Sequence, residues 1–141
     1  MEIQLWQIIL LTALAFIAVC ENLSTSVITS QPVIIGTIAG IIMGDMKMGL
    51  AVGATLQLMI LGVGTYGGAS IPDYMTGAII GTAYAIISGK GMEFGIGLAV
   101  PVGLLMVQLD VLARFSNVFF AKRVDVAIEK LDFKAIGRNT W

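Results

Sequence analysis

The sequence predicts an all-α integral membrane protein with two re-entrant helical hairpins, one kinked transmembrane helix and a C-terminal interfacial amphipathic helix. Its 141 residues are 57% hydrophobic and 12% charged, about half the charged share of an ordinary soluble domain. The mean hydropathy is +0.95. From Met48 to Val63 the chain is uncharged and rich in glycine, and in membranes such small residues let helices approach closely or break beside a cavity.

The first predicted hairpin covers residues 3–43. An apolar segment over 3–20 is followed by a polar stretch over 21–32 and by a second apolar run over 33–43. The second run is too short to cross a bilayer as a helix, which takes about 20 residues. We therefore favour a hairpin whose polar tip lies inside the membrane thickness, where protein or water must satisfy its backbone groups.

The alternative is a pair of helices joined by an ordinary interfacial loop, the second helix continuing through residues 44–59. That arrangement buries Asp45 and Lys47 in mid-membrane at a cost of about 2.5–3.5 kcal/mol each. We interpret these two charges instead as a turn at the membrane surface. Only Glu2 precedes the first apolar segment, so a signal peptide, which begins with basic residues, is not expected.

The second predicted hairpin covers residues 46–88. Its polar turn is Thr65–Asp73, where Gly67, Gly68 and Pro72 interrupt the apolar pattern. The apolar run that follows the turn ends at Ser88 and is again short for a crossing. The order of apolar run, polar turn and short apolar run thus occurs twice, a weak internal repetition typical of transporters built from broken helices.

The best candidate for a full crossing begins after the charged loop 89–93. Residues 94–109 are uncharged, and apolar character continues to Ala121. Pro101 lies inside this segment and is expected to kink it, because proline removes one helical hydrogen bond.

The composition changes sharply near residue 121. Residues 121–141 hold five of the eight basic residues of the chain. An apolar stripe at helical spacing predicts an amphipathic helix; its members are Val124, Ile128, Leu131 and Ala135. By the positive-inside rule this end is cytoplasmic. The sequence therefore divides into a membrane-embedded domain, 1–121, and a cytoplasmic amphipathic segment, 122–141, with the N-terminus outside.

Several classes of function are excluded or disfavoured by composition. The chain has no histidine and one cysteine, Cys20, so it lacks the commonest metal ligand and general base, and we expect no metal, no cofactor and no catalytic residue. Cys20 lies in an apolar run and is expected to be a small buried hydrophobe. The net charge of −1 gives no signal for nucleic-acid binding.

Three motifs carry a resemblance to a known family. They are Gly44-Asp45-Met46-Lys47, Gly53-Ala54-Thr55-Leu56-Gln57 and Pro72-Asp73. In this order and spacing, over essentially the whole chain, the sequence resembles the N-terminal half of the IIC component of the mannose/fructose/sorbose family of bacterial sugar phosphotransferase systems (PTS). Members of that family are nearly twice as long.

The resemblance implies a multi-pass permease subunit of the bacterial inner membrane that carries a hexose or related sugar and is not itself an enzyme. It implies a IID membrane subunit as partner, and cytoplasmic IIA and IIB subunits that pass a phosphoryl group to the sugar. It also implies trimers of heterodimers that move by an elevator-type motion, and, for some members, a role as receptor for bacteriocins.

Five polar residues are the candidates for binding the sugar: Gln57, Thr55, Asp73, Glu21 and Asn22. Gln57 comes first, because an unpaired amide in an apolar run costs about 1–3 kcal/mol. A hydrogen bond from Gln57 to Thr55 or to a partner helix is an equally weighted explanation. Asp73 closes one polar turn and Glu21 and Asn22 open the other, so these residues bind the ligand or simply cap helices and contact solvent.

Two further classes stay open, a small membrane scaffold or channel without sugar transport and a docking receptor for a peptide toxin; a membrane-bound enzyme ranks third. Because the polar turns need burial, the 141 residues alone are not expected to translocate sugar. We expect an oligomer or complex whose contact uses the small residues Gly77, Gly81 and Ala85.

Overall fold

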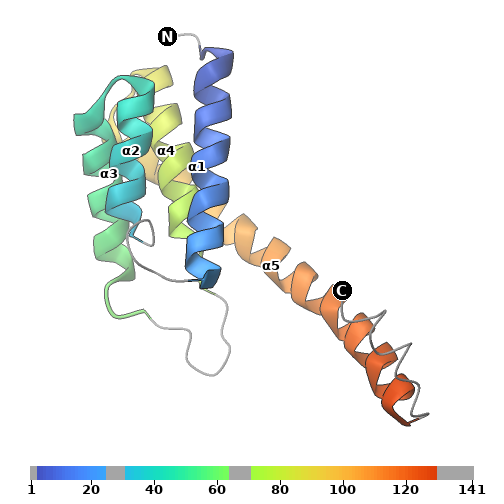
Figure 1. Ribbon diagram of the computed structural model, residues 1–141. Coiled ribbons are helices and arrows are strands. Elements are labelled where there is room, and N and C mark those ends of the chain that lie inside the picture. Colours follow the sequence, from blue (N-terminus) through green and yellow to red (C-terminus); the bar gives the residue numbers. More distant parts are fainter. Residues whose placement is uncertain (1–2, 25–30, 64–70, 130–141) are drawn as a thin grey trace. The chain divides into compact units, whose positions relative to one another are not determined.

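The computed structural model describes residues 3–24, 31–63 and 71–129 (Figure 1). These ranges fold as five helices: α1 (Leu5–Ser24), α2 (Pro32–Met43), α3 (Met46–Ile60), α4 (Tyr74–Ser88) and α5 (Met92–Glu129). The all-helical class is confirmed. Within the described ranges, α5 is the one helix that is long and apolar enough to cross a membrane, and the other four are shorter apolar helices.

The turn between α2 and α3 consists of two residues. Gly44 ends α2 with φ +88°, a left-handed conformation that glycine adopts without strain. The next residue, Asp45, starts α3, because its carboxylate accepts a hydrogen bond from the backbone N–H of Met48 at 3.0 Å. A turn this short forces the two helices to lie antiparallel and in contact.

Glycines on both helices form the contact between α2 and α3. A Cβ atom built on Gly36 would lie 2.8 Å from the Cα of Gly53, and one on Gly40 would lie 2.9 Å from the Cα of Gly49. These separations are shorter than any side chain tolerates. The backbones can approach this closely only because all four positions lack a side chain.

Helices α4 and α5 form a second pair of the same kind. A Cβ atom on Gly77 would lie 2.7 Å from the carbonyl oxygen of Ala99, and one on Gly81 would lie 2.6 Å from that of Gly95. The expectation that Gly77, Gly81 and Ala85 form a contact between chains is therefore wrong. Helix α5 of the same chain already occupies this small-residue surface.

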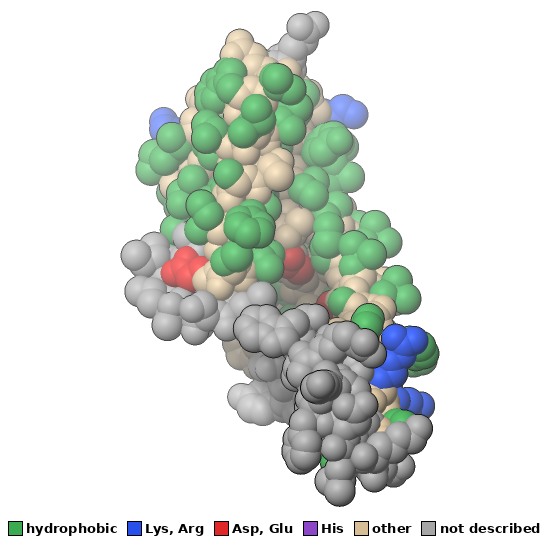
Figure 2. All heavy atoms as spheres, turned by 45° about the vertical axis from the view of Figure 1, so that its right-hand side comes forward, with side chains coloured by type: hydrophobic (Ala, Val, Ile, Leu, Met, Phe, Trp, Pro, Cys, Tyr) green, Lys and Arg blue, Asp and Glu red, His purple; other side chains and the backbone are tan. Residues whose placement is uncertain are grey.

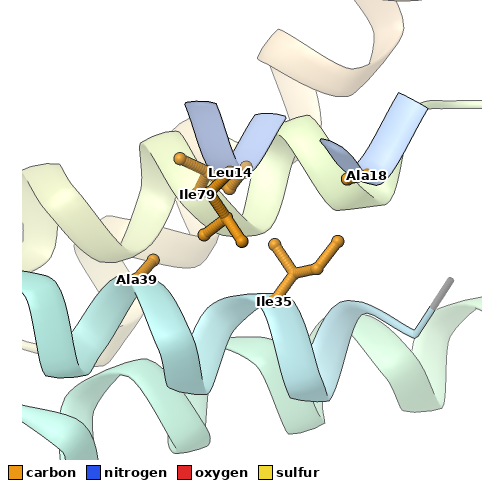
Figure 3. Packing of buried hydrophobic residues seen from close by; sticks show 5 residues of the cluster. All are labelled: Leu14, Ala18, Ile35, Ala39 and Ile79. Atoms are coloured by element: carbon orange, nitrogen blue, oxygen red, sulfur yellow. The ribbon is translucent and has the colours of Figure 1, made fainter. Parts of the chain in front are cut away.

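Two hydrophobic clusters lie between the helices. One joins α1, α2 and α4 (Figure 3), and its buried members are Leu14, Ala18, Ile35, Ala39 and Ile79. The other joins α3, α4 and the first part of α5, through Val52, Leu56, Ala78, Ala85 and Ala99. Helix α4 contributes to both clusters, and seven of its 15 residues are buried, most of them small.

The predicted hairpins 3–43 and 46–88 pair α1 with α2 and α3 with α4. The close glycine contacts instead join α2 to α3 and α4 to α5. Parts of both polar turns, residues 25–30 and 64–70, lie outside the described residues. Re-entry of these turns into the membrane therefore stays a prediction.

The chain divides into two compact units, Met1–Val107 and Gln108–Trp141, and the division falls inside α5. Helix α5 is continuous past Pro101 and past residue 121, where the sequence suggested a boundary. The kink at Pro101 stays a prediction, as does the boundary. Leu131 and Ala135 of the expected amphipathic stripe lie outside the described residues.

Hydrophobic side chains cover much of the outer surface of the helices. Figure 2 shows them spread over one face with few charged side chains among them. On α1 they include Phe16, which is 70% exposed, and Ile17. Cys20 is also exposed, so its expected burial is wrong. It lies on the outward side of α1, away from the stripe of Leu14 and Ala18 that packs on the other helices.

Candidate functional site

Four helix ends gather at one end of the unit formed by residues 1–107. Helices α1 and α3 end there, and α2 and α4 begin there (Figure 1). The predicted residues Glu21 and Asn22 lie in the last turn of α1, and Asp73 directly precedes α4. Gln57 lies one turn before the end of α3. The fold thus brings four of the five predicted site residues to the same end of the helices.

Gln57 has the property expected of a ligand-binding amide. Its side-chain oxygen, Oε1, is buried and has no hydrogen-bond partner among the described residues. The residue as a whole is only partly buried, although Oε1 itself is not exposed. An unpaired buried acceptor costs about 1–3 kcal/mol, and a ligand hydroxyl that donates to Oε1 would remove this cost.

Thr55 does not pair with Gln57. Its hydroxyl donates to the carbonyl oxygen of Ala51 at 2.9 Å and also contacts the Met92 sulfur at 3.9 Å. Residues two apart on a helix point about 200° apart, so Thr55 and Gln57 lie on different sides of α3. The predicted alternative of a Gln57–Thr55 hydrogen bond is therefore wrong, and Thr55 faces the start of α5 instead.

Asp73 caps helix α4. Its Oδ1 atom accepts hydrogen bonds from the backbone N–H groups of Met75 and Thr76, both at 3.1 Å. Its Oδ2 atom accepts from the Thr76 hydroxyl, and its own N–H donates to the carbonyl of Gly103 at 3.2 Å. These bonds fix the start of α4 against α5, so the capping alternative describes what this carboxylate does in the structure.

The two candidates on α1 are less completely defined. Glu21 is half-buried, and Asn22 is helical, but its side chain lies outside the described part of the chain. Both belong to the last turn of α1, where carbonyl groups lack helical partners.

Sequence reasoning missed a second buried polar atom. The Thr82 hydroxyl is fully buried in α4 and has no hydrogen-bond partner among the described residues. Thr82 lies on the same side of α4 as Ala78 and Ala85, which pack on Val52 and Leu56 of α3. The one feature of the sequence that could have indicated Thr82 is its hydroxyl group within a run of small apolar residues.

Charges at the opposite helix ends lie in turns or in the first turn of a helix. Asp45 caps α3, and Lys47 is exposed. In the turn before α5, the ammonium group of Lys90 lies 5.0 Å from the centre of the Phe94 ring. The described residues contain no cluster of three or more His, Cys, Asp or Glu side chains suited to a metal ion.

Comparison with known proteins gives a consistent result. Residues 5–141 match the family model described as PTS system sorbose-specific IIC component. The chain is 35% identical over 136 residues to the sorbose-specific EIIC component of Klebsiella pneumoniae, and 33% identical over 136 residues to the mannose-specific EIIC component of Escherichia coli (strain K12). Each alignment covers 96% of this chain and 51% of the relative.

A shorter relative is similar over nearly all its length. The Escherichia coli (strain K12) protein provisionally named N-acetylgalactosamine permease IIC component 2 is 35% identical over 116 residues, which cover 82% of this chain and 86% of that protein. The chain thus spans about half the length of the sorbose-specific and mannose-specific relatives and most of the length of this one.

Proposed function

The chain belongs to the family of sorbose-specific IIC components of the phosphotransferase system, and on that premise we propose that it forms part of a permease that binds and translocates a hexose or related sugar. It is a protein of the bacterial cytoplasmic membrane. The relatives carry the names of sorbose, mannose and N-acetylgalactosamine systems, which makes these three sugars the first ligands to test.

The unpaired Oε1 atom of Gln57 is the observation that carries the proposal. A primary amide matches a sugar well, because its oxygen accepts a hydrogen bond from one hydroxyl while its NH₂ group donates to the next. Gln57 lies near the helix ends where Glu21, Asn22 and Asp73 are also found. Glu21 and Asn22 would supply further polar groups for a ligand at this end, while Asp73 caps α4 and the Thr55 hydroxyl bonds within α3.

Phosphoryl transfer is assigned to partners. The chain has no histidine and therefore no phosphohistidine, so IIA and IIB subunits would phosphorylate the sugar. A IID subunit would complete the membrane part, in trimers of heterodimers. The chain itself is a transport subunit and not an enzyme.

The membrane arrangement follows from helix lengths. At ~1.5 Å per residue, α2 is about 18 Å long and α3 and α4 are about 22 Å long, against a hydrocarbon core of ~30 Å. We propose that residues 1–121 are embedded, that the short helices belong to re-entrant hairpins, and that α5 crosses the membrane. The segment 122–141 would then lie on the cytoplasmic side.

The test is sugar binding by the Gln57→Leu variant, assembled with its IID partner and purified in mild detergent. The three sugars are first titrated against the wild-type complex, and the one that binds is used as the probe. Loss of the amide is expected to weaken binding by about 1–3 kcal/mol, or roughly 5- to 150-fold, because a sugar hydroxyl is left unpaired.

Gln108→Leu is the matched control, because it makes the same chemical change at an exposed position of α5. It should bind the sugar as the wild type does. Unchanged affinity in a folded Gln57→Leu complex would assign Gln57 to helix packing and remove the main support for this site.

A further inference from the structure

The C-terminal part of α5 carries two stripes of different chemistry. Positions 112, 115, 119, 123 and 126 recur at helical spacings of three and four. They form the aromatic stripe, whose members are Leu112, Phe115, Phe119, Arg123 and Val126, with Lys122 beside them. All six are exposed, and Phe115 is 77% exposed. Two cations therefore lie among the most exposed apolar side chains of this helix.

The second stripe lies on the other side of the helix and is polar except for one alanine. Its members are Asp110, Arg114, Asn117, Ala121 and Asp125, again at spacings of three and four. Here Arg114 pairs with Asp110 at 2.8 Å, so this cation is neutralised on its own side. Asp125 also belongs to the polar stripe and lies on the opposite side of the helix from Arg123, whereas Lys122, three residues before Asp125, lies at the border between the two stripes.

Contacts within the aromatic stripe hold its cation close to the rings. The guanidinium carbon of Arg123 lies 4.5 Å from the centre of the Phe119 ring. Phe120, which is not a member of the stripe, meets the Phe119 ring edge to face at 6.2 Å. Aromatic rings combined with basic side chains on one side of a helix are typical of helices that lie at the membrane interface.

The position of the stripe along α5 agrees with such an interface. The helix is uncharged from Phe94 to Leu109, which corresponds to about 24 Å of helix. Most of a hydrocarbon core is therefore crossed before Asp110, and the aromatic stripe follows where headgroups begin.

We infer that the aromatic stripe binds anionic phospholipid headgroups, with Lys122 and Arg123 contacting the phosphate groups and Phe115 and Phe119 lying at the boundary between the headgroups and the acyl chains. Charge complementarity selects this occupant: an anionic lipid supplies acyl chains and negative charge at one site, and each basic side chain near the surface attracts it. The inference rests on the membrane location of the proposed function and is independent of the sugar site, so either can fail alone.

The test uses the full chain with a single tryptophan as a probe. Trp6 and Trp141 are replaced by Phe, and Phe119→Trp places the probe in the aromatic stripe. The protein is reconstituted in phosphatidylcholine vesicles that contain equal mole fractions of brominated phosphatidylglycerol or brominated phosphatidylcholine. Because two cations lie at the surface, phosphatidylglycerol should be enriched around the probe on the order of tenfold over its mole fraction in the vesicle. Brominated phosphatidylglycerol should therefore quench the probe more strongly than brominated phosphatidylcholine does.

The excess quenching is the quenching by brominated phosphatidylglycerol beyond that by brominated phosphatidylcholine. The variants Lys122→Gln and Arg123→Gln should each reduce it. Arg114→Gln removes one positive charge from the polar stripe and should leave the excess intact, and an Asn117→Trp probe on that stripe should show a smaller excess. Helical circular dichroism checks that each variant folds. Equal quenching by the two lipids, an excess that survives both Gln variants, or no quenching by either lipid would overturn the inference.

Discussion

Gln57 in α3 and Thr82 in α4 each bury a polar side-chain atom that has no hydrogen bond in the described structure. Gln57 lies one turn before the end of α3 and is only partly buried as a residue. Thr82 is fully buried between α3 and α4, where apolar and small side chains surround it. The two atoms therefore call for different tests, with ligand binding for Gln57 and stability for Thr82.

Thr82→Val removes the unpaired hydroxyl and keeps the shape of the side chain. Because the hydroxyl lacks a partner, the variant should be as stable as the wild type or more stable by about 1 kcal/mol. The measurement is thermal unfolding in detergent, followed by circular dichroism, together with sugar binding by the assembled complex. Sugar affinity should not change.

Thr82→Ser is the matched control, since it keeps the hydroxyl and removes the methyl group. It should be less stable than Thr82→Val, because it leaves a small cavity and retains the polar atom. A Val variant that unfolds more easily than the Ser variant, or that loses the sugar, would show that the hydroxyl has a partner in the working protein.

Single residues differ in how well the sequence predicts their roles. Gln57 was identified because an amide in a long uncharged run has few ways to be satisfied. Thr82 was missed because buried helical threonines usually bond to the carbonyl four residues earlier, as Thr37 and Thr55 do here. For Asp73 the sequence left capping and binding open, and only the positions of the Met75 and Thr76 N–H groups decide for capping.

At the scale of helices, the pairs α2–α3 and α4–α5 share the same kind of close contact between small residues. In α2–α3, Gly36 faces Gly53 and Gly40 faces Gly49; in α4–α5, the pairs are Gly77 with Ala99 and Gly81 with Gly95. Within each helix the two small residues are four positions apart, which places both on the side that meets the partner helix. Three of the four helices involved are too short to span a bilayer, so this contact holds each pair together inside the unit.

Gly53→Ala tests the contact between α2 and α3. The added Cβ would lie 2.6 Å from the carbonyl oxygen of Pro32 and 2.9 Å from the Cα of Val33. These are backbone atoms, so the helices must separate, and the variant should lose about 1–3 kcal/mol of stability. A lower midpoint of thermal unfolding in detergent is the expected result.

Gly97→Ala is the control for Gly53→Ala, because a Cβ at Gly97 meets nothing within 4 Å. Alanine favours a helix by about 1 kcal/mol over glycine at such a position, so this variant should be as stable as the wild type or more stable. Equal effects of the two substitutions would contradict the packing described for α2 and α3.

The sequence predicts which segments are helical more reliably than which helices pair. Apolar runs and the breaks at Gly44 and at residues 89–91 locate the helices, because propensity and turn chemistry are local. Pairing depends on which small-residue surfaces meet, and the sequence offers several. The spacing of Gly36 with Gly40 and of Gly49 with Gly53 was the available signal for the closest pair, whereas hairpins drawn around the polar turns grouped the helices differently.

At the scale of the molecule, the chain exposes large hydrophobic side chains on α1 and along α5, as a membrane protein or a subunit of a larger assembly does. Its polar helix ends carry candidate ligand groups, and it lacks the histidine that phosphoryl transfer in this system would use. Sugar binding is therefore proposed for this chain, and completion of the pathway and phosphorylation are proposed for its partners.

The most direct test of this account is uptake of labelled sugar into vesicles, measured with the chain alone and with IID, IIA, IIB and a phosphoryl donor. The sugar is the one identified by titration of the wild-type complex. The account predicts no uptake by the chain alone, and accumulation of sugar phosphate when all partners are present. Uptake of free sugar by the chain alone would contradict it and would indicate a self-sufficient channel.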